Sequence, residues 1–303
     1  MRAQVSPRER WKADGALLFI TAFWGVTFVV VKDAHGHSDA YSFIALRFAV
    51  GAAVLTVLAR RSVLKRENLQ KGALLSLFLL AGFLLQTLGL ERTTPSRSAF
   101  ITGLCVILVP FITLVVFRRV PRVASLFGVG LACAGLYVLT APAGGEAGLT
   151  TGDLLTLGAA LAYAIHISLT ERFAPDEGAI GLVAVQLWGV ALGAAACLPF
   201  VEAHVEWTPA YVGAFLFCGL FASAMAISIQ TWAQARTTAV RAALVYALEP
   251  VFAAAYSVAL GYERLGGREA AGGALIIVGV LVAEAGPALW SRVRASRAAH
   301  HLG

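Results

Sequence analysis

Charged residues are scarce in this sequence of 303 residues, because Asp, Glu, Lys and Arg together make up only 14%. Soluble domains usually carry about 25% charged residues. Hydrophobic residues make up 59% of the chain, and the mean hydropathy is +0.78. A soluble core of this size could not bury so much apolar surface, whereas a lipid bilayer accepts it. The composition therefore predicts a membrane protein.

The signature motifs of several enzyme and pump classes are absent. The sequence contains no His-Glu-x-x-His, no Gly-x-Ser-x-Gly and no P-loop, which weighs against a membrane-embedded hydrolase and an ATP-driven pump. The four cysteines, Cys105, Cys133, Cys197 and Cys218, lie inside apolar runs without metal-ligand spacing. We expect buried thiols, no metal site, no cofactor and no enzymatic activity.

The net charge of +7 would suggest a nucleic-acid partner in a soluble protein. Here the basic residues lie in short loops between apolar runs, a distribution typical of membrane topology. We therefore expect no nucleic acid among the partners, which should be a small-molecule substrate and membrane lipid. The sequence does not set the oligomeric state, and a monomer can function in principle.

Ten apolar runs are each about as long as a membrane-spanning helix, which needs about 20 residues. They are uniformly apolar rather than alternating, so they predict helices and not barrel strands. The first run continues past the length of a signal-peptide core and lacks a cleavage site, so we expect a retained helix. The ten runs are 14–32, 40–59, 72–91, 97–117, 123–141, 152–171, 179–200, 209–233, 238–261 and 269–290.

Basic residues are unevenly divided between the two sides of such a chain. With ten spans both termini lie on one side, and the segments on that side hold 18 Lys and Arg, against five in the loops on the other side. The positive-inside rule therefore predicts cytoplasmic termini.

An internal repeat is the most informative feature. Arg92-Thr93-Thr94 recurs as Arg236-Thr237-Thr238, an offset of 144 positions, and Arg97 recurs at the same offset as Arg241. We expect one integral membrane domain made of two five-helix repeats, 1–141 and 142–303. Because five is odd, the second copy must enter the membrane from the opposite face, and such inverted repeats are typical of secondary transporters.

Glycines repeat at the same offset. Gly128 and Gly135 match Gly272 and Gly279, and each pair is seven residues apart on one helix face. Small residues allow helices to approach closely in lipid. We expect the fifth and tenth runs to pack against each other or against a neighbour.

Two residue pairs connect these features to a known family. A Trp24-Gly25 pair stands in the first run, and a Glu249-Pro250 pair in the ninth is followed by Gly261-Tyr262-Glu263. With ten runs in two halves, these residues resemble the EamA-type branch of the drug/metabolite transporter superfamily over about 14–290. The first half departs from the pattern, since Val109 and not Glu precedes its proline.

The resemblance implies a multi-pass protein of the bacterial inner membrane. It implies a central cavity lined by spans 1, 3, 4, 6, 8 and 9, with spans 2, 5, 7 and 10 at the periphery. It also implies metabolite export, most specifically of amino acids, as in the bacterial aromatic amino-acid exporters. A non-transporting scaffold subunit, or a transporter of drugs, sugars or nucleotide derivatives, remains the alternative.

Polar groups inside spans are costly and often functional. Glu249 either binds a proton or substrate, or is a structural carboxylate that caps a neighbouring helix. Pro110 and Pro250 each lack a backbone donor and would free the carbonyls of Val106 and Tyr246. These kinks would widen a midplane cavity, or would serve packing alone.

The remaining candidates for the cavity wall are aromatic, amide and hydroxyl side chains on the spans that the resemblance assigns to it. For each of them the alternative is that it fills the bundle, and His166 is either a proton carrier or a satisfied buried histidine. The candidates are Trp24, Thr27, Phe83, Gln86, Phe100, Tyr163, His166, Gln230 and Tyr246.

Arg47 lies about seven residues into the second run. It could attract a carboxylate from the outer side, snorkel to the membrane surface or make a polar contact between helices. We favour snorkelling or the helix contact, since the resemblance places this span at the periphery.

Overall fold

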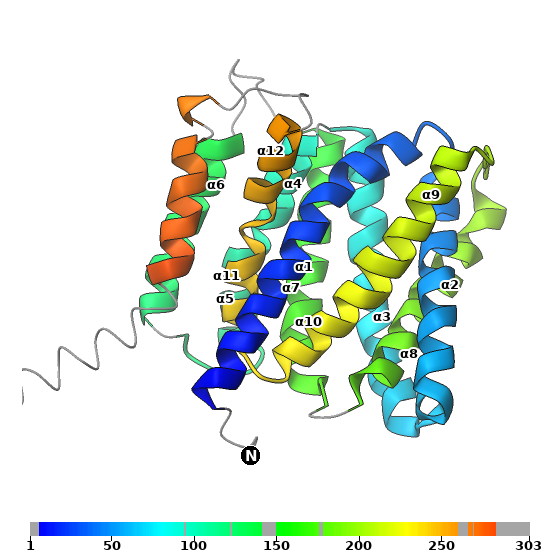
Figure 1. Ribbon diagram of the computed structural model, residues 1–303, viewed down its shortest axis with the longest axis horizontal. Coiled ribbons are helices and arrows are strands. Elements are labelled where there is room, and N and C mark those ends of the chain that lie inside the picture. The colour runs from blue at the N-terminus through cyan, green and yellow to red at the C-terminus, as the bar shows by residue number, and fades with distance from the viewer. Residues whose placement is uncertain are drawn as a thin grey trace, which may run out of the picture.

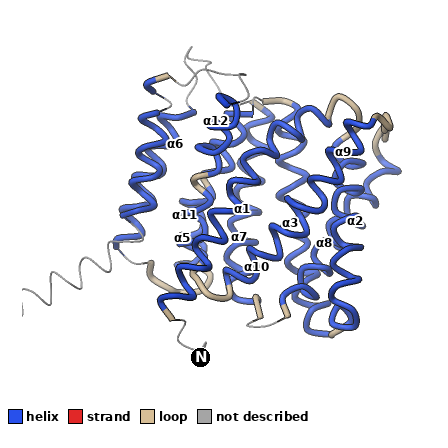
Figure 2. The backbone as a smooth tube through the Cα atoms, in the orientation of Figure 1, coloured by secondary structure: helices blue, strands red, loops and turns tan. Residues whose placement is uncertain are grey.

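The computed structural model describes most of the chain, and its described residues are almost entirely helical (Figure 2). Within them β-pairing is limited to one isolated bridge between Ser38 and Val205. The prediction of an all-α protein is confirmed for this part of the chain. The described ranges are 6–93, 95–121, 123–140, 150–175, 178–259, 266–268 and 270–282.

The helices run back and forth across a single bundle (Figure 1). In chain order they are α1 (Pro7–Ala34), α2 (Ala40–Ala59), η1 (Arg60–Leu64), α3 (Arg66–Glu91), α4 (Pro95–Gly103), α5 (Cys105–Val115), α6 (Val123–Thr140), α7 (Thr151–Phe173), α8 (Ala179–Cys197), η2 (Leu198–Phe200), α9 (Pro209–Phe217), η3 (Cys218–Met225), α10 (Ala226–Gln234), α11 (Ala239–Tyr246) and α12 (Glu249–Ala259). A last apolar helix covers Ala270–Val282.

Seven helical stretches among the described residues are long and apolar enough to cross a membrane. Three shorter apolar helices, Ile101–Val115, Val123–Val138 and Ala270–Val282, accompany them. Each of the ten predicted runs overlaps one of these helices, and positions 283–290 of the tenth run lie outside the described residues. The number of spans and the inverted repeat stay predictions.

Two of the predicted runs are each built from two helices. The fourth is divided at Leu104, between α4 and α5, and Pro110 lies inside α5 six positions later. The ninth is divided just before Glu249, the first residue of α12, and Pro250 follows it. A proline ring clashes with the carbonyl four residues back, so α11 ends at that residue, Tyr246.

The eighth run changes its helical register in the middle. Between α9 and α10 lies the π-helix η3, in which the backbone N–H of Ala226 donates to the carbonyl of Phe221, five residues back. In an α-helix that N–H would donate to Ala222, so the wider turn frees this carbonyl for another donor.

Glycines bring α6 and the Ala270–Val282 helix into contact at one edge of the bundle (Figure 1). A methyl group on Gly135 would lie 2.6 Å from the carbonyl oxygen of Gly272. One on Gly279 would lie 2.7 Å from the carbonyl oxygen of Gly128. The prediction that the four repeated glycines join the fifth and tenth runs is confirmed.

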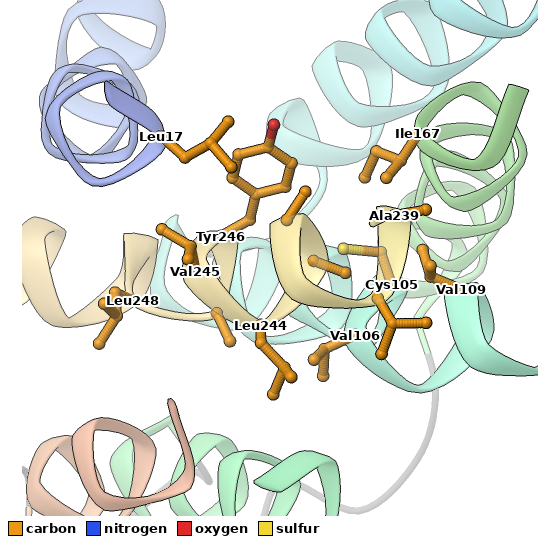
Figure 3. Packing of buried hydrophobic residues seen from close by; sticks show 14 of the residues in the cluster. Leu17, Cys105, Val106, Val109, Ile167, Ala239, Leu244, Val245, Tyr246 and Leu248 are labelled. Atoms are coloured by element: carbon orange, nitrogen blue, oxygen red, sulfur yellow. The ribbon is translucent and has the colours of Figure 1, made fainter. Parts of the chain in front are cut away.

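Two apolar clusters form most of the core. The first combines residues of α1, α5, α6, α7, α10, α11 and the Ala270–Val282 helix, and the second combines residues of α2, η1, α3, α8, η3 and α10. Figure 3 shows the first cluster, where Leu17 of α1 and Ile167 of α7 flank Tyr246 of α11. The space between the clusters holds the cavity described below.

Polar contacts fasten the connection between α1 and α2 to the one between η2 and α9. The Asp39 carboxylate accepts hydrogen bonds from the backbone of Tyr41, Ser42 and His204 at 2.9, 2.9 and 3.0 Å. Burial alone would raise the pKa of Asp39, but these hydrogen bonds to the charged form outweigh it and lower the pKa. The N-terminus of α2 is therefore capped by a carboxylate at neutral pH.

The glycine contact makes a direct prediction about stability. Gly135→Leu should overpack the interface between α6 and Ala270–Val282 and cost about 1–3 kcal/mol. Gly130 is the matched control, because it lies on the same helix and a methyl group there has no neighbour within 4 Å. Thermal unfolding in detergent should show a lower Tm for Gly135→Leu and no loss for Gly130→Leu. Equal Tm values for the two variants would contradict the interface.

Candidate functional site

A cavity lies between the two core clusters and encloses about 870 Å³ of atom-free space, its open mouth included. Its wall is mostly apolar and aromatic with a few polar side chains. The lining residues are Trp24, Thr27, Val31, Arg47, Leu79, Phe83, Gln86, Thr87, Leu90, Thr102, Cys105, Tyr163, His166, Ile167, Ile227, Gln230, Tyr246 and Glu249.

Nine of the ten residues predicted to bind substrate line this one cavity. They are Trp24, Thr27, Phe83, Gln86, Tyr163, His166, Gln230, Tyr246 and Glu249. The side chain of the tenth, Phe100, lies outside the described part of the chain, as do Gly261-Tyr262-Glu263. Two prolines predicted to kink helices, Pro110 and Pro250, are buried beside the cavity and are not among its lining residues.

The cavity extends toward one end of the bundle. Its lining reaches Val31 in the last turn of α1 and Leu90 near the end of α3. Toward the other end, Leu17 and Ile167 pack on either side of Tyr246 in the first core cluster (Figure 3). An ion pair between Asp14 and Arg241, with 2.8 Å between the oxygen and nitrogen, lies beyond them.

A chain of hydrogen bonds ties together three helices of the wall. The Tyr163 hydroxyl of α7 donates to Gln86 Oε1 of α3 at 3.0 Å, and Gln86 Nε2 donates to Thr102 Oγ1 of α4 at 3.1 Å. The Tyr163 ring packs directly against Gly82, because any side chain at this position would clash with the ring. The amide of Gln86 is thereby held in one orientation.

The opposite wall is aromatic. Trp24 and Tyr246 meet edge to face with 5.3 Å between ring centroids. The Trp24 indole donates to the carbonyl of Ala222 at 3.0 Å, the carbonyl that the π-helix frees. The Tyr246 hydroxyl is buried and has no hydrogen-bond partner among the described residues.

Gln230 and His166 form the third part of the wall, and each is hydrogen-bonded to a buried amide behind it. Gln230 donates to Gln234 at 3.0 Å, and Gln234 donates to the carbonyl of Ile167 at 2.9 Å. His166 Nε2 lies 2.9 Å from Gln186 Oε1, an atom that only accepts, so this nitrogen carries a proton. The contact favours the interpretation of His166 as a satisfied buried histidine.

Arg47 is buried on the wall and does not snorkel. Its side chain is 4% exposed, and Nε donates to Ser223 Oγ of η3 at 2.8 Å. The prediction of a polar contact between helices is confirmed, and the alternative of snorkelling is wrong. Gly51 and Gly219 explain the depth, because they let α2 and η3 approach so closely that no side chain fits between their backbones.

Glu249 is the one carboxylic acid among the lining residues. It is the first residue of α12, directly after the break in the ninth run, and is partly buried. Its carboxyl group makes no hydrogen bond or ion pair with any described residue. The cavity thus contains one carboxyl group, that of Glu249, and one guanidinium group, that of Arg47, which are not paired with each other.

The sequence did not indicate Thr87, Thr102 or Cys105, and of the three alternatives for Arg47 the attraction of a carboxylate was not the one favoured. A signal existed for Arg47, since a charge seven residues into an apolar run needs a partner inside the protein. Thr102 and Cys105 lie where α4 passes into α5 at Leu104, and no sequence pattern marked that break. Only the folded arrangement shows which of the many polar residues in the spans meet.

The hydrogen-bond chain predicts that loss of the hydroxyl group lowers the stability of the protein at one tyrosine and not at another. Tyr163→Phe removes the donor to Gln86 and should destabilise the protein by about 1–3 kcal/mol. Tyr137→Phe is the control, because Tyr137 is 64% exposed on α6. Thermal unfolding in detergent should show a lower Tm for Tyr163→Phe alone. Unchanged stability in both variants would mean that the chain does not hold the wall.

Fold and site together define a class of protein: a multi-pass helical membrane protein with a cavity between its helices. Comparison with known proteins then identifies the family. The EamA-like transporter family matches residues 11–141 and again 150–284. The chain belongs to this family.

Relatives and a solved structure agree with this assignment. An uncharacterized transporter of Archaeoglobus fulgidus is 29% identical over 274 residues, which cover 90% of this chain and 86% of the relative. The uncharacterized transporter YyaM of Bacillus subtilis is 25% identical over 289 residues, covering 88% and 92%. A crystal structure at 21% identity has a TM-score of 0.74 and covers 90% of this chain and 96% of its own, which shows the same fold.

Proposed function

We propose that this protein is a secondary transporter that exports neutral amino acids, aromatic ones included, across the bacterial inner membrane by alternating access. Family membership supports membrane transport. The observation that carries the substrate class is the cavity wall, where Glu249 faces aromatic rings and hydrogen-bonding amides.

An amino acid would find a partner for each of its polar and apolar parts. The Glu249 carboxylate can hold an ammonium group, and the rings of Trp24 and Tyr246 add faces that attract a cation. The Tyr246 hydroxyl has no partner among the described residues, so it can donate to a solute. The apolar wall of Leu79, Ile167 and Ile227, with Val31 and Leu90 toward the mouth, suits a side chain.

Matching contacts at the two ends of the bundle support the inverted repeat. Thr93 donates to Asp153, with 3.0 Å between the oxygens, at the start of α7, the first helix of the second half. Thr237, at the matching position, donates to Asp14 near the start of α1, the first helix of the first half, at 3.4 Å. In each half, the first threonine of the repeated Arg-Thr-Thr motif therefore donates a hydrogen bond to the first helix of the other half.

These contacts offer a mechanism for alternating access. The cavity of this structure extends toward the end of the bundle that holds Thr93, and the ion pair of Asp14 and Arg241 lies at the closed end. With cytoplasmic termini, this arrangement faces outward. Breaking the contacts of Asp14 while the equivalent ones at Asp153 tighten would open the cavity to the cytoplasm.

A transport assay tests the substrate class. Purified protein in liposomes should show counterflow of at least one labelled neutral amino acid, measured with and without a pH gradient. Glu249→Gln should lower the rate about tenfold or more, the loss of about 1.4 kcal/mol of binding free energy. Glu202→Gln, in an exposed loop, is the control with full activity. Counterflow of none of the amino acids would contradict the assignment of the substrate class. An undiminished transport rate in Glu249→Gln would contradict the role of Glu249.

A labelling assay tests whether the ion pair of Asp14 and Arg241 acts as a gate, that is, whether it keeps the cytoplasmic end of the cavity closed. Asp14→Asn removes the charge paired with Arg241, and a partly buried pair of this kind is worth about 1 kcal/mol or more. In a Leu17→Cys background without the native cysteines, Asp14→Asn should raise alkylation from the cytoplasmic side several-fold. Asp33→Asn, an exposed acid in the last turn of α1, should not change it. Equal alkylation in both variants would contradict the gate.

A further inference from the structure

Arg47 is a buried charge on the cavity wall that the described residues do not neutralise. Its one hydrogen bond runs from Nε to Ser223 Oγ at 2.8 Å, and it makes no ion pair with any described residue. A guanidinium has five donors, so the two terminal nitrogens retain donor capacity. An uncompensated buried charge is strongly unfavourable, and its persistence indicates that a ligand supplies the missing anion.

The surroundings hold the guanidinium in a fixed position. Its central carbon lies 4.8 Å from the centroid of the Phe83 ring and 5.2 Å from that of Phe48. Phe83 in turn meets Tyr163 edge to face at 5.5 Å. With Nε anchored on Ser223, the side chain has lost its freedom before any solute arrives, which favours binding.

We infer that Arg47 binds the carboxylate of the transported solute, so that the cavity recognises a zwitterion between Arg47 and Glu249. The inference rests on the proposed function and names the group that selects the substrate. The two charges line one cavity but lie on different walls. Arg47 lies on the wall with Phe83 and Tyr163, whereas Glu249 belongs to α12.

The charge balance of the wall favours a carboxylate over other anions. Arg47 is the one Lys or Arg among the lining residues, and Glu249 is the one acid. A phosphate dianion would leave a net negative charge in the cavity and would be repelled by Glu249. A simple amine would leave Arg47 without a partner. An amino acid neutralises both groups, and a carboxylate matches the planar fork of a guanidinium.

The test compares three forms of one solute on the wild-type protein. In the liposome assay, unlabelled amino acid, its methyl ester and its decarboxylated amine compete with the labelled amino acid. The free acid should compete about tenfold or more better than the ester and the amine, a difference of about 1.4 kcal/mol. Equal competition by all three would overturn the inference while leaving transport intact.

Substitutions of Arg47 then test whether this residue causes the preference for the free acid over the amine. Arg47→Gln should raise the KM of the acid about tenfold or more and abolish the preference over the amine, and Arg47→Lys should restore part of it. Arg172→Gln is the matched control, because Arg172 also lies over a ring, that of Phe117 at 5.7 Å, but is exposed and outside the cavity. A preference that survives in Arg47→Gln would overturn the inference.

A binding measurement separates this inference from the proposed function. Thermal unfolding of wild-type protein should show stabilisation by the free acid and none by the amine, whether or not transport is detected. Loss of that stabilisation in Arg47→Gln supports the inference. Counterflow that does not discriminate between the free acid and the amine would overturn the role of Arg47 alone. The absence of both counterflow and stabilisation would overturn both proposals.

Discussion

The bundle depends on one constraint: polar groups within the hydrocarbon region have no water to bind, so they must find partners inside the protein. Many of the buried polar side chains bond to a carbonyl of their own helix, and several form pairs or chains that cross from helix to helix. Tyr163, Gln86 and Thr102 join α7, α3 and α4. Gln234 joins α10 to α7, and Trp24 joins α1 to η3.

Three groups that lack such partners lie together and point to function. Among the described residues, Glu249 and the Tyr246 hydroxyl make no hydrogen bond, and Arg47 uses only one of its nitrogens. All three line the same cavity. A cavity that gathers three polar groups without full sets of partners is suited to a solute with complementary charges.

Irregular helix geometry and small residues make this arrangement possible. The break before Glu249 places a carboxyl group at the start of α12, and the π-helix supplies both Ser223 and the free carbonyl of Ala222. The glycines at 51 and 219 bring α2 against η3, which carries Arg47 inward. Departures from a regular helix therefore occur where the cavity needs a polar group, as expected for a functional site.

Much of this arrangement could be predicted from the sequence, because lipid imposes long apolar runs and makes each charge within them conspicuous. The helices and the glycine contact of α6 followed from such patterns, and nine of the cavity residues followed from the spans that the family resemblance assigns to a cavity. The depth of Arg47 did not, since the periphery assigned to its helix ignored the glycines at 51 and 219. The break at Leu104 and the π-helix also escaped prediction, because they arise from packing between helices and not from a local breaker such as Pro110.

The central claim is that two copies of one bundle face opposite sides of the membrane and enclose the shared cavity. Arg92 and Arg236 occupy matching positions in the two copies. The most direct test replaces each with cysteine in a cysteine-free chain and labels intact cells and inside-out vesicles with a membrane-impermeant maleimide. We predict that position 92 reacts only in intact cells and position 236 only in the vesicles. Reaction of both positions from the same side would contradict the account.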